Sequence, residues 1–285
     1  MSQKPVYRSS EGFALIAVLW LVAAMSVLVG GIMLTVRAEL KTAGLSRQTI
    51  VAQAVGEGAM QIALQELKAS GKPVDKILEA PISYGGREIM VRLIPMNGYI
   101  DLNKAPVELL QAAFQFAGGL DQGSAGSLAA VVDAGRKEPG PSGRPPGFEA
   151  VEDLLLIPGV TYPLYSRVSR VLTTDAGGSG QVNVQAAPPD VLNIVAAGNE
   201  SAVGAFMQTR GGDNVGADTS AMNGAWIDNG TAAKTVEMTA RVPLPDGGAV
   251  LVIRRYLVRP SPKDGLPWRV FHANAVVELA SIPKI

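Results

Sequence analysis

The pattern of apolar residues divides the first 70 residues into two parts. Residues 13–36 form a run of 24 residues without a charge, apolar on every side of a helix. From residue 37 to residue 70, apolar residues recur with helical spacing. One stripe consists of Val51, Val55 and Ile62, and a neighbouring one of Met60, Leu64 and Leu67. Gly71 and Pro73 follow in the order that ends a helix. The pattern predicts a single helix from residue 13 to about residue 69, amphipathic in its second half.

Alternating apolar and polar positions predict strands on both sides of a long middle segment. Residues 82–95 read as a hairpin that turns at Gly85-Gly86. Three further alternating runs lie at residues 234–244, 249–258 and 268–277, separated by turn sequences rich in proline and glycine. We expect these strands to form one antiparallel sheet that packs against the amphipathic half of the long helix.

The middle segment contains an internal repeat. Residues 98–106 (GYIDLNKAP) match residues 180–188 (GQVNVQAAP) at a constant offset of 82, and the match continues from Glu108-Leu-Leu to Asp190-Val-Leu. Each copy reads as a short strand followed by a proline at a helix start, with an acid in the first turn, where it complements the helix dipole. We therefore predict a mainly helical domain inserted into the sheet.

The length of the N-terminal apolar run favours a membrane span over a cleaved secretory signal. A helix of this length covers about 36 Å, more than the roughly 30 Å of a hydrocarbon core. A signal peptide would have an apolar region of roughly 7–15 residues and then a small-residue cleavage site. Two positive residues, Lys4 and Arg8, and one negative residue, Glu11, precede the run. Arg37 and Lys41 follow it. This balance predicts a cytoplasmic N-terminal flank and an exported C-terminal body.

Composition narrows the chemistry. The formal net charge is zero, which argues against polyanion binding as the main activity. There is no cysteine, so disulfides and thiolate sites are excluded, and the single histidine, His272, lies in an alternating run that places it on a strand surface. Glu149, Glu152 and Asp153 could serve acid–base chemistry, but they begin an apolar run, 148–157, where we expect a helix whose dipole they stabilise. We expect no enzymatic activity and no required cofactor.

The sequence Leu156-Ile-Pro-Gly-Val160 has two interpretations. Between helical stretches it is similar to a helix-hairpin-helix turn, whose backbone amides can hold a nucleic-acid phosphate. Such a turn normally has a second glycine and several basic neighbours, whereas here Thr161-Tyr-Pro-Leu164 follows, with Arg167 and Arg170 nearby. We interpret the segment as a packing turn.

A glycine-rich loop at residues 211–231 carries oxygen-bearing side chains. Hard cations such as calcium prefer these ligands, although the spacing does not fit an EF-hand. The candidate ligands are Asp213, Asn214, Asp218, Asp228 and Asn229. Structural calcium and a polar loop without a ligand both remain open.

The N-terminus as a whole resembles the type IV pilin and pseudopilin family. A short basic leader precedes Gly12-Phe13, and an apolar helix that becomes amphipathic follows. The resemblance implies that a prepilin peptidase cleaves after Gly12 and methylates the amino group of Phe13. The family pattern places a glutamate fifth from the cleavage, where this chain has Ala17. An apolar residue there is typical of the K-type minor pseudopilins of type II secretion, the GspK family.

Four internal segments also resemble the K-type family, in the same order. They are GEGAMQIALQEL (56–67), GYIDLNKAP (98–106), FEAVEDLLLIPGVTYPLYSRVSRVLT (148–173) and GQVNVQAAPPDVL (180–192). Each is a weak match alone, and the order makes the set specific. The resemblance implies an α+β, pilin-like fold with a large inserted, mainly helical domain. Some relatives are thought to hold structural calcium in that domain.

The expected organisation joins these observations. It comprises a leader (1–12), a transmembrane half-helix (13–36), an amphipathic half-helix with the first strands (37–96), an inserted helical domain (97–233) and C-terminal strands (234–285). The resemblance implies a minor pseudopilin in the bacterial inner membrane, with its body in the periplasm, at the tip of the secretion pseudopilus. Its partners would be I- and J-type minor pseudopilins, other pseudopilins and the prepilin peptidase, with no nucleic acid. A minor pilin of a type IV pilus and a membrane-anchored DNA-binding protein of DNA uptake are the alternatives.

Overall fold

The structure is a computed structural model. It describes the backbone of residues 11–139, 146–210, 218–245, 247–259, 265–273 and 277–279. Side chains are described within these ranges except at residues 11–14, 30–46 and 277–279. Contacts divide the chain into two units, residues 1–52 and residues 53–285. We describe each unit by itself.

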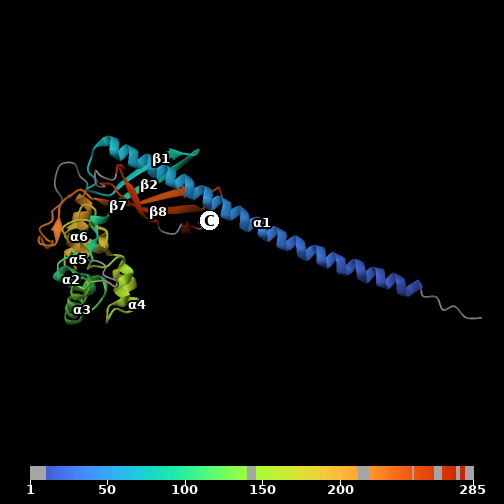
Figure 1. Ribbon diagram of the computed structural model, residues 1–285, viewed down its shortest axis with the longest axis horizontal. Coiled ribbons are helices and arrows are strands. Elements are labelled where there is room, and N and C mark those ends of the chain that lie inside the picture. Colours follow the sequence, from blue (N-terminus) through green and yellow to red (C-terminus); the bar gives the residue numbers. More distant parts are fainter. Residues whose placement is uncertain are drawn as a thin grey trace, which may run out of the picture. The chain divides into compact units, whose positions relative to one another are not determined.

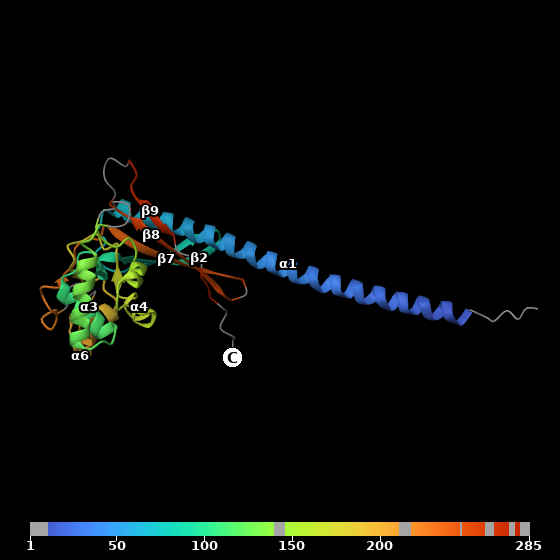
Figure 2. The same cartoon turned by 60° about the horizontal axis from the view of Figure 1, so that its bottom comes forward.

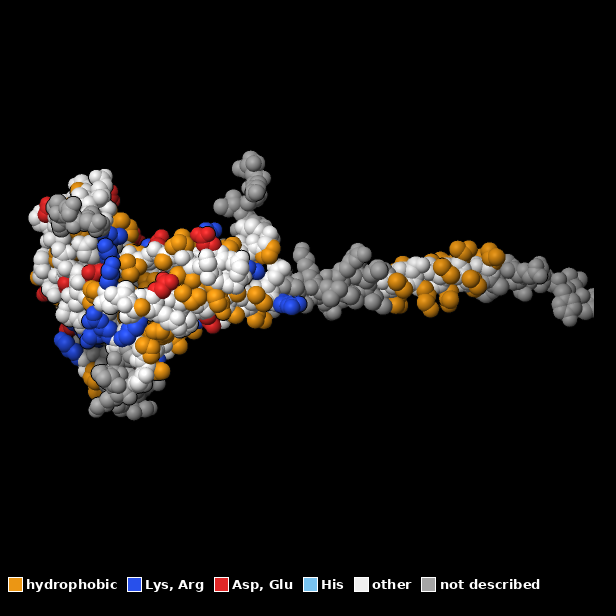
Figure 3. All heavy atoms as spheres, turned by 90° about the horizontal axis from the view of Figure 1, so that it is seen from above, with side chains coloured by type: hydrophobic (Ala, Val, Ile, Leu, Met, Phe, Trp, Pro, Cys, Tyr) orange, Lys and Arg blue, Asp and Glu red, His pale blue; other side chains and the backbone are white. Residues whose placement is uncertain are grey.

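The long N-terminal helix predicted from the sequence is present. Helix α1 comprises Glu11–Ser70, 60 residues. Its last turn closes as Ser70 Oγ donates to Leu67 O over 2.8 Å and Gly71 N donates to Lys68 O over 3.3 Å. In the first unit, the large apolar side chains between Leu15 and Val29 are all exposed (Figure 3).

The predicted span at residues 13–36 lies partly outside the described side chains. Among the residues that the structure describes, no helix is both long enough and apolar enough to cross a membrane.

The second unit is built on an antiparallel sheet of six strands (Figure 1). Its strands are β1 (Leu78–Tyr84), β2 (Arg87–Pro95), β7 (Thr235–Pro243), β8 (Ala249–Leu257), β9 (Arg269–Ala273) and β10 (Val277–Leu279). Strands β1, β2, β7 and β8 lie side by side in that order. The predicted hairpin is confirmed: Tyr84 pairs with Arg87 across Gly85-Gly86, both of which have positive φ, as a tight hairpin turn requires.

The strands before and after the helical segment, β2 and β7, are neighbours in the middle of this sheet. Residues 90–95 of β2 pair with residues 236–241 of β7. The helical segment therefore leaves the sheet after β2 and returns to it on the neighbouring strand. The resulting α+β arrangement, with an antiparallel sheet against the second part of α1, is the pilin-like one that the sequence predicted.

Of the last predicted strand, residues 268–277, the structure describes β9 at residues 269–273 and the first residue of β10, and residues 274–276 lie outside the described residues. Strand β9 pairs with β8 at residues 254–257, and β10 pairs with β8 at residues 249–251. The pairing of β9 has a register shift between Arg255 and Tyr256. This bulge lies within the β8–β9 pairing and bends the ladder locally, and β10 pairs with the other half of the same edge of β8.

Helix α1 contacts the sheet through small residues. A Cβ at Gly56 would lie 2.8 Å from a methyl group of Val252, so the helix backbone comes close to β8. Met60 and Leu64 are buried on the same side, as the sequence predicted, and the Glu57 carboxylate pairs with Arg254. Val51, predicted to lie in an apolar stripe, is 44% exposed. The face of α1 that contacts the sheet contains the small residues Gly56, Ala59 and Ala63. It does not contain the β-branched stripe, because only small side chains let the helix backbone come this close to β8.

The segment between β2 and β7 is mainly helical (Figure 2). It folds around its own apolar core. Its helices are α2 (Val107–Ala112), α3 (Gln122–Gly135), α4 (Tyr162–Val168), α5 (Pro189–Val195) and α6 (Glu200–Thr209), with short helical turns at η1 (Met96–Gly98), η2 (Ala113–Ala117) and η4 (Val151–Leu156). Two pairs of short parallel strands complete it: β3 (Ile100–Asp101) with β4 (Leu172–Thr173), and β5 (Val182–Asn183) with β6 (Ile227–Asp228). Phe114, Leu110 and Phe206 are among its most deeply buried side chains.

The helix predicted at residues 148–157 is a short 3-10 turn, η4. Asp153 Oδ2 accepts hydrogen bonds from Glu149 N and Ala150 N over 2.8 and 3.1 Å. The acid therefore binds amides at the start of the turn, as expected, but Pro158 and Gly159 follow immediately and stop further propagation.

Candidate functional site

The processing site lies outside the described side chains. Neither Gly12 nor Phe13 has a described side chain, so cleavage and methylation stay predictions. Ala17 is described, and its side chain is exposed on α1. It is available for contact with a neighbouring helix.

The predicted calcium loop is only partly described. Asp213 and Asn214 lie outside the described residues. Asp218 Oδ1 accepts a hydrogen bond from Ser220 N over 2.8 Å, and this bond lowers the pKa of the Asp218 carboxyl. Asp228 belongs to strand β6, where it pairs with Asn183 of β5. Among the described residues, no group of three His, Cys, Asp or Glu side chains could hold a metal ion, and Asn229 Oδ1 accepts instead from Gln185 Nε2.

His272 lies on the exposed surface of edge strand β9, as the sequence predicted. It borders a groove of about 730 Å³ that Glu149, Glu152 and Tyr165 also line. Burial and the neighbouring Glu152 raise the pKa of Tyr165. Arg255, in the same groove, pairs with Asp175 over 2.9 Å and with Glu237 over 3.0 Å. The positive charge that faces the acids is therefore already neutralised, and the groove holds a structural ion-pair network.

The turn at Leu156–Val160 packs within the helical segment. A Cβ at Gly135 of α3 would lie 2.9 Å from Ile157 Cδ1, whereas Leu156 is 81% exposed. Arg167, one of the two nearby basic residues, donates from Nε to Gly118 O over 2.9 Å. This guanidinium holds a backbone carbonyl, which fits the interpretation as a packing turn.

The two repeat copies form corresponding strands, caps and helices. In the first, Asp101 ends strand β3 and its Oδ1 accepts from Asn103 N over 2.9 Å. In the second, Asn183 ends β5 and its Oδ1 accepts from Gln185 N over 3.0 Å. Pro106 and Pro188 occupy the N-caps of α2 and α5, with Glu108 and Asp190 in the first turns. Each copy therefore has the predicted order of strand, proline and helix.

The two copies pack on each other reciprocally. A Cβ at Gly98 would lie 2.5 Å from the backbone of Ala186, and a Cβ at Gly180 would overlap the carbonyl oxygen of Lys104. Gly98 corresponds to Gly180, and Lys104 to Ala186, at the same offset of 82. Each copy thus presents its glycine to the same loop of the other copy, which is the pattern of a two-fold contact.

An arginine stabilises this loop in each copy, and sequence comparison missed both residues. Arg136 Nη1 donates to Leu102 O over 3.3 Å and to Ala105 O over 2.8 Å. Arg210 donates in the same way to the corresponding carbonyls, those of Val184 and Ala187, over 3.4 and 2.5 Å. The two arginines are 74 residues apart and not 82, because α6 is shorter than α3 and begins earlier in its copy. A comparison at a fixed offset of 82 therefore did not pair them.

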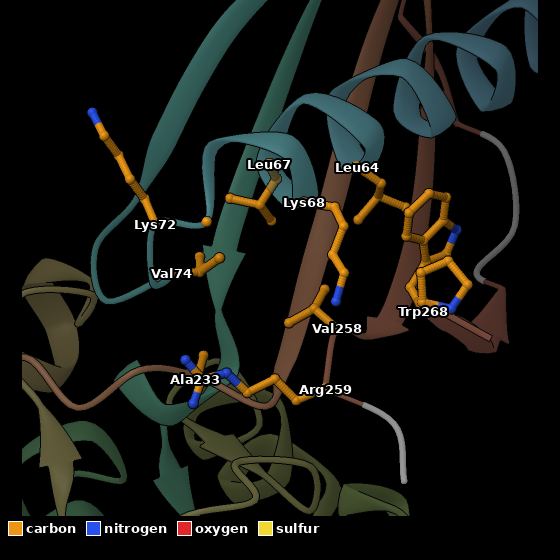
Figure 4. Close-up of a pocket in the computed structure, with 11 residues that line it drawn as sticks. Leu64, Leu67, Lys68, Lys72, Val74, Ala233, Val258, Arg259 and Trp268 are labelled. Atoms are coloured by element: carbon orange, nitrogen blue, oxygen red, sulfur yellow. The ribbon is translucent and has the colours of Figure 1, made fainter. Parts of the chain in front are cut away.

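A cavity of about 230 Å³ lies at the end of α1, next to the sheet (Figure 4). Its lining residues come from α1 and the turn after it, from residue 233 before β7, and from the ends of β8 and β9. They are Leu64, Leu67, Lys68, Gly71, Lys72, Val74, Ala233, Val258, Arg259, Pro267 and Trp268. The lining combines apolar side chains with three cations and contains no acid. Nothing in the sequence predicted this cavity, because its cations lie in segments far apart along the chain.

Comparisons with known proteins add little to this description. No protein-family model and no curated protein sequence matches the chain. A chain in the crystal structure of the GspK–GspI–GspJ complex from the enterotoxigenic Escherichia coli type 2 secretion system is similar, with a TM-score of 0.47 and 11% identity. The match covers 86% of this chain and 99% of that one. We therefore base the function proposed below on the chain's own sequence and contacts.

Proposed function

We propose that this chain is a minor pseudopilin of a type II secretion system, acting by assembly and not by catalysis. One observation carries the proposal: the uncharged run at residues 13–36 continues without a break into a helix whose second part packs on an antiparallel sheet. The order of the four K-type sequence segments supports the same assignment. The chain would be anchored in the bacterial inner membrane, with its body in the periplasm.

The contact between α1 and the sheet supports a role in assembly. Arg254 on β8 has only 8% of its side chain exposed and pairs with Glu57 of α1. Gln61 of the same helix accepts a hydrogen bond from Trp268 Nε1 over 2.9 Å. These two contacts, together with the close approach at Gly56, hold the second part of α1 against the sheet. The part of α1 that precedes these contacts would then pack against other subunits.

Processing would occur between Gly12 and Phe13. The small glycine lets a prepilin peptidase approach the backbone beside the apolar helix. Mass spectrometry of membrane-extracted chain should show a methylated Phe13 at the N-terminus, and a strain without the peptidase is the control. A terminus that still includes residues 1–12 in cells with active peptidase would count against the assignment.

The proposed position at the tip of the pseudopilus rests on Ala17. In pilin-like assemblies, the glutamate at this place is thought to neutralise the amino group of the neighbouring subunit. Both groups lie in a bundle of low dielectric constant, where an unpaired charge costs several kcal/mol in order of magnitude. Ala17 cannot meet the amino group of a subunit above it, whereas a subunit below can still supply a glutamate to Phe13. The chain is therefore suited to the first place in the fibre.

Two experiments test the partners and the position. The full chain, co-expressed with I- and J-type minor pseudopilins, should co-purify with both in the presence of nuclease; failure to associate would remove the assembly proposal. Labelled chain should be found at one end of assembled fibres, and Ala17→Glu should not create repeated incorporation, because the inserted helical segment still crowds the shaft. Label at regular intervals along the fibre would refute the tip position.

A further inference from the structure

We propose that the cavity at the end of α1 binds the C-terminal residue of another polypeptide chain. The apolar side chain of that residue would lie on the cavity floor, and its free carboxylate would bind Lys68 and Arg259. This inference goes beyond the proposed function, because it concerns a peptide site of this chain and does not depend on the assembly in which the chain takes part.

The floor of the cavity is apolar and held in place. Leu64, Val74 and Ala233 are 2%, 4% and 2% exposed, so they form a closed base. Ala233 N donates to Val74 O over 2.8 Å, which ties the strand side of the cavity to the turn after α1. The Trp268 indole is fixed by its hydrogen bond to Gln61 of α1. A preformed apolar base of this kind binds an apolar group without having to order its own side chains first.

The charge at the cavity is positive and uncompensated within the described part of the chain. Its lining includes Lys68, Lys72 and Arg259 and no acidic residue. Among the described residues, none of these three cations forms an ion pair or a side-chain hydrogen bond. Lys68 extends along the cavity toward Val258, whereas Lys72 points away from the other labelled side chains (Figure 4). The anion contact is therefore assigned to Lys68 and Arg259, the two lining cations that remain.

The size of the cavity restricts the anion that fits. Its volume, about 230 Å³, is below the roughly 300–1,000 Å³ of sites for drug-sized ligands. A single apolar side chain with a carboxylate on the same carbon suits this volume, and a long fatty acyl chain does not. The C-terminal residue of a polypeptide has these two groups side by side, and proteins capture such carboxylates at defined sites.

The occupant we commit to is another chain. The last described strand, β10, pairs with residues 249–251 of β8. The cavity lies at the other end of β8, next to Val258. The described C-terminal strand therefore does not lead toward the cavity.

The test uses the full chain in phospholipid nanodiscs and a library of random octapeptides displayed with free C-termini. We expect selected peptides to share an apolar last residue. Each selected peptide is then remade with a fluorescent label, as the free acid and as the C-terminal amide, and titrated by fluorescence polarisation. The amide should bind at least about tenfold more weakly, as expected for loss of a charge-assisted contact. Palmitate, added as a competitor, should not displace the peptide.

Three variants localise the site. Lys68→Gln and Arg259→Gln should each weaken binding of the free acid by roughly tenfold without changing the weaker binding of the amide. Ala233→Leu fills the cavity and should abolish binding while retaining every charge. Lys72→Gln, next to the cavity but pointing away, is the matched control and should bind as the parent does.

Several results would overturn the assignment. These are a library without enrichment, equal binding of acid and amide, displacement by palmitate, or unchanged binding to Ala233→Leu. Co-purification with minor pseudopilins is measured separately, so loss of the peptide site with assembly intact would refute this inference alone.

Discussion

The reciprocal packing of the two repeat copies predicts that adding one methyl group at either glycine destabilises the helical segment. In Gly98→Ala, the new Cβ would lie 2.5 Å from the carbonyl carbon and oxygen of Ala186 and 2.8 Å from Ala187 N. These neighbours are backbone atoms, which cannot move away by changing a rotamer. The two copies must therefore separate locally to accept the methyl group.

The magnitude follows from the type of contact. Overpacking against a rigid neighbour typically costs about 1–3 kcal/mol, which is the expected loss in unfolding free energy for Gly98→Ala. Gly180 has the same kind of overlap, with Lys104 O, and in addition a φ of +94°, which a residue with a Cβ rarely adopts. This conformation adds roughly 1–2 kcal/mol, so Gly180→Ala should be the more harmful change.

The assay is urea unfolding of the full chain in detergent, followed by tryptophan fluorescence. Trp226 packs against the core of the helical segment and reports on it directly. Gly178→Ala is the matched control, because a Cβ at Gly178 would have nothing within 4 Å. It should change the unfolding free energy by less than about 0.5 kcal/mol. Midpoints for Gly98→Ala and Gly180→Ala that equal the parent's would refute the reciprocal contact.

Three further predictions concern buried charge. Arg136→Met and Arg210→Met should each lower the unfolding free energy by about 1–3 kcal/mol, because each leaves two loop carbonyls without a donor; Arg-to-Lys variants should recover part of the loss. Burial raises the pKa of Asp101, so the native state holds its proton more tightly than the unfolded state, and this group's contribution to stability falls as pH rises above about 4. Asp101→Asn should therefore gain stability relative to the parent between pH 4 and pH 7 in urea titrations, and a gain that is the same at both pH values would contradict this reasoning. Glu57→Gln weakens the contact with Arg254; because Glu57 is 42% exposed and water replaces part of the contact, the expected loss is about 1–2 kcal/mol, and the double variant with Arg254→Met should lose less than the sum of the two single changes.

Several features of the candidate sites could be predicted from sequence, and others could not. The turn at Leu156–Val160 and the exposed position of His272 followed from local patterns. The cavity did not, because Lys68 and Arg259 become neighbours only when the end of α1 packs beside the end of β8. Lysine and arginine at unrelated positions carry no signal that they share a site.

The pairing of the last predicted strand shows a similar limit. Residues 268–277 alternate well enough to predict a single strand, and alternation is a property of the residues themselves. The register of a strand depends on its pairing partner, and the bulge between Arg255 and Tyr256 shifts the pairing of β9 with β8. Strands β3 and β5 are the short strands predicted in the two repeat copies, whereas their two-residue partners β4 and β6 are too short for any alternation to be seen.

By itself, the sequence determined the long helix, the hairpin at Gly85-Gly86, the insertion between two sets of strands and the existence of the repeat. Each of these depends on the spacing of residues along a short stretch or on similarity between two stretches. Only the tertiary structure decided that β2 pairs with β7, that small residues of α1 face β8, and that Gly98 and Gly180 pack on each other's copies. These features depend on contacts between residues far apart in the chain. Which segments pack together there is decided by how closely their backbones can approach and not by the local pattern of residues.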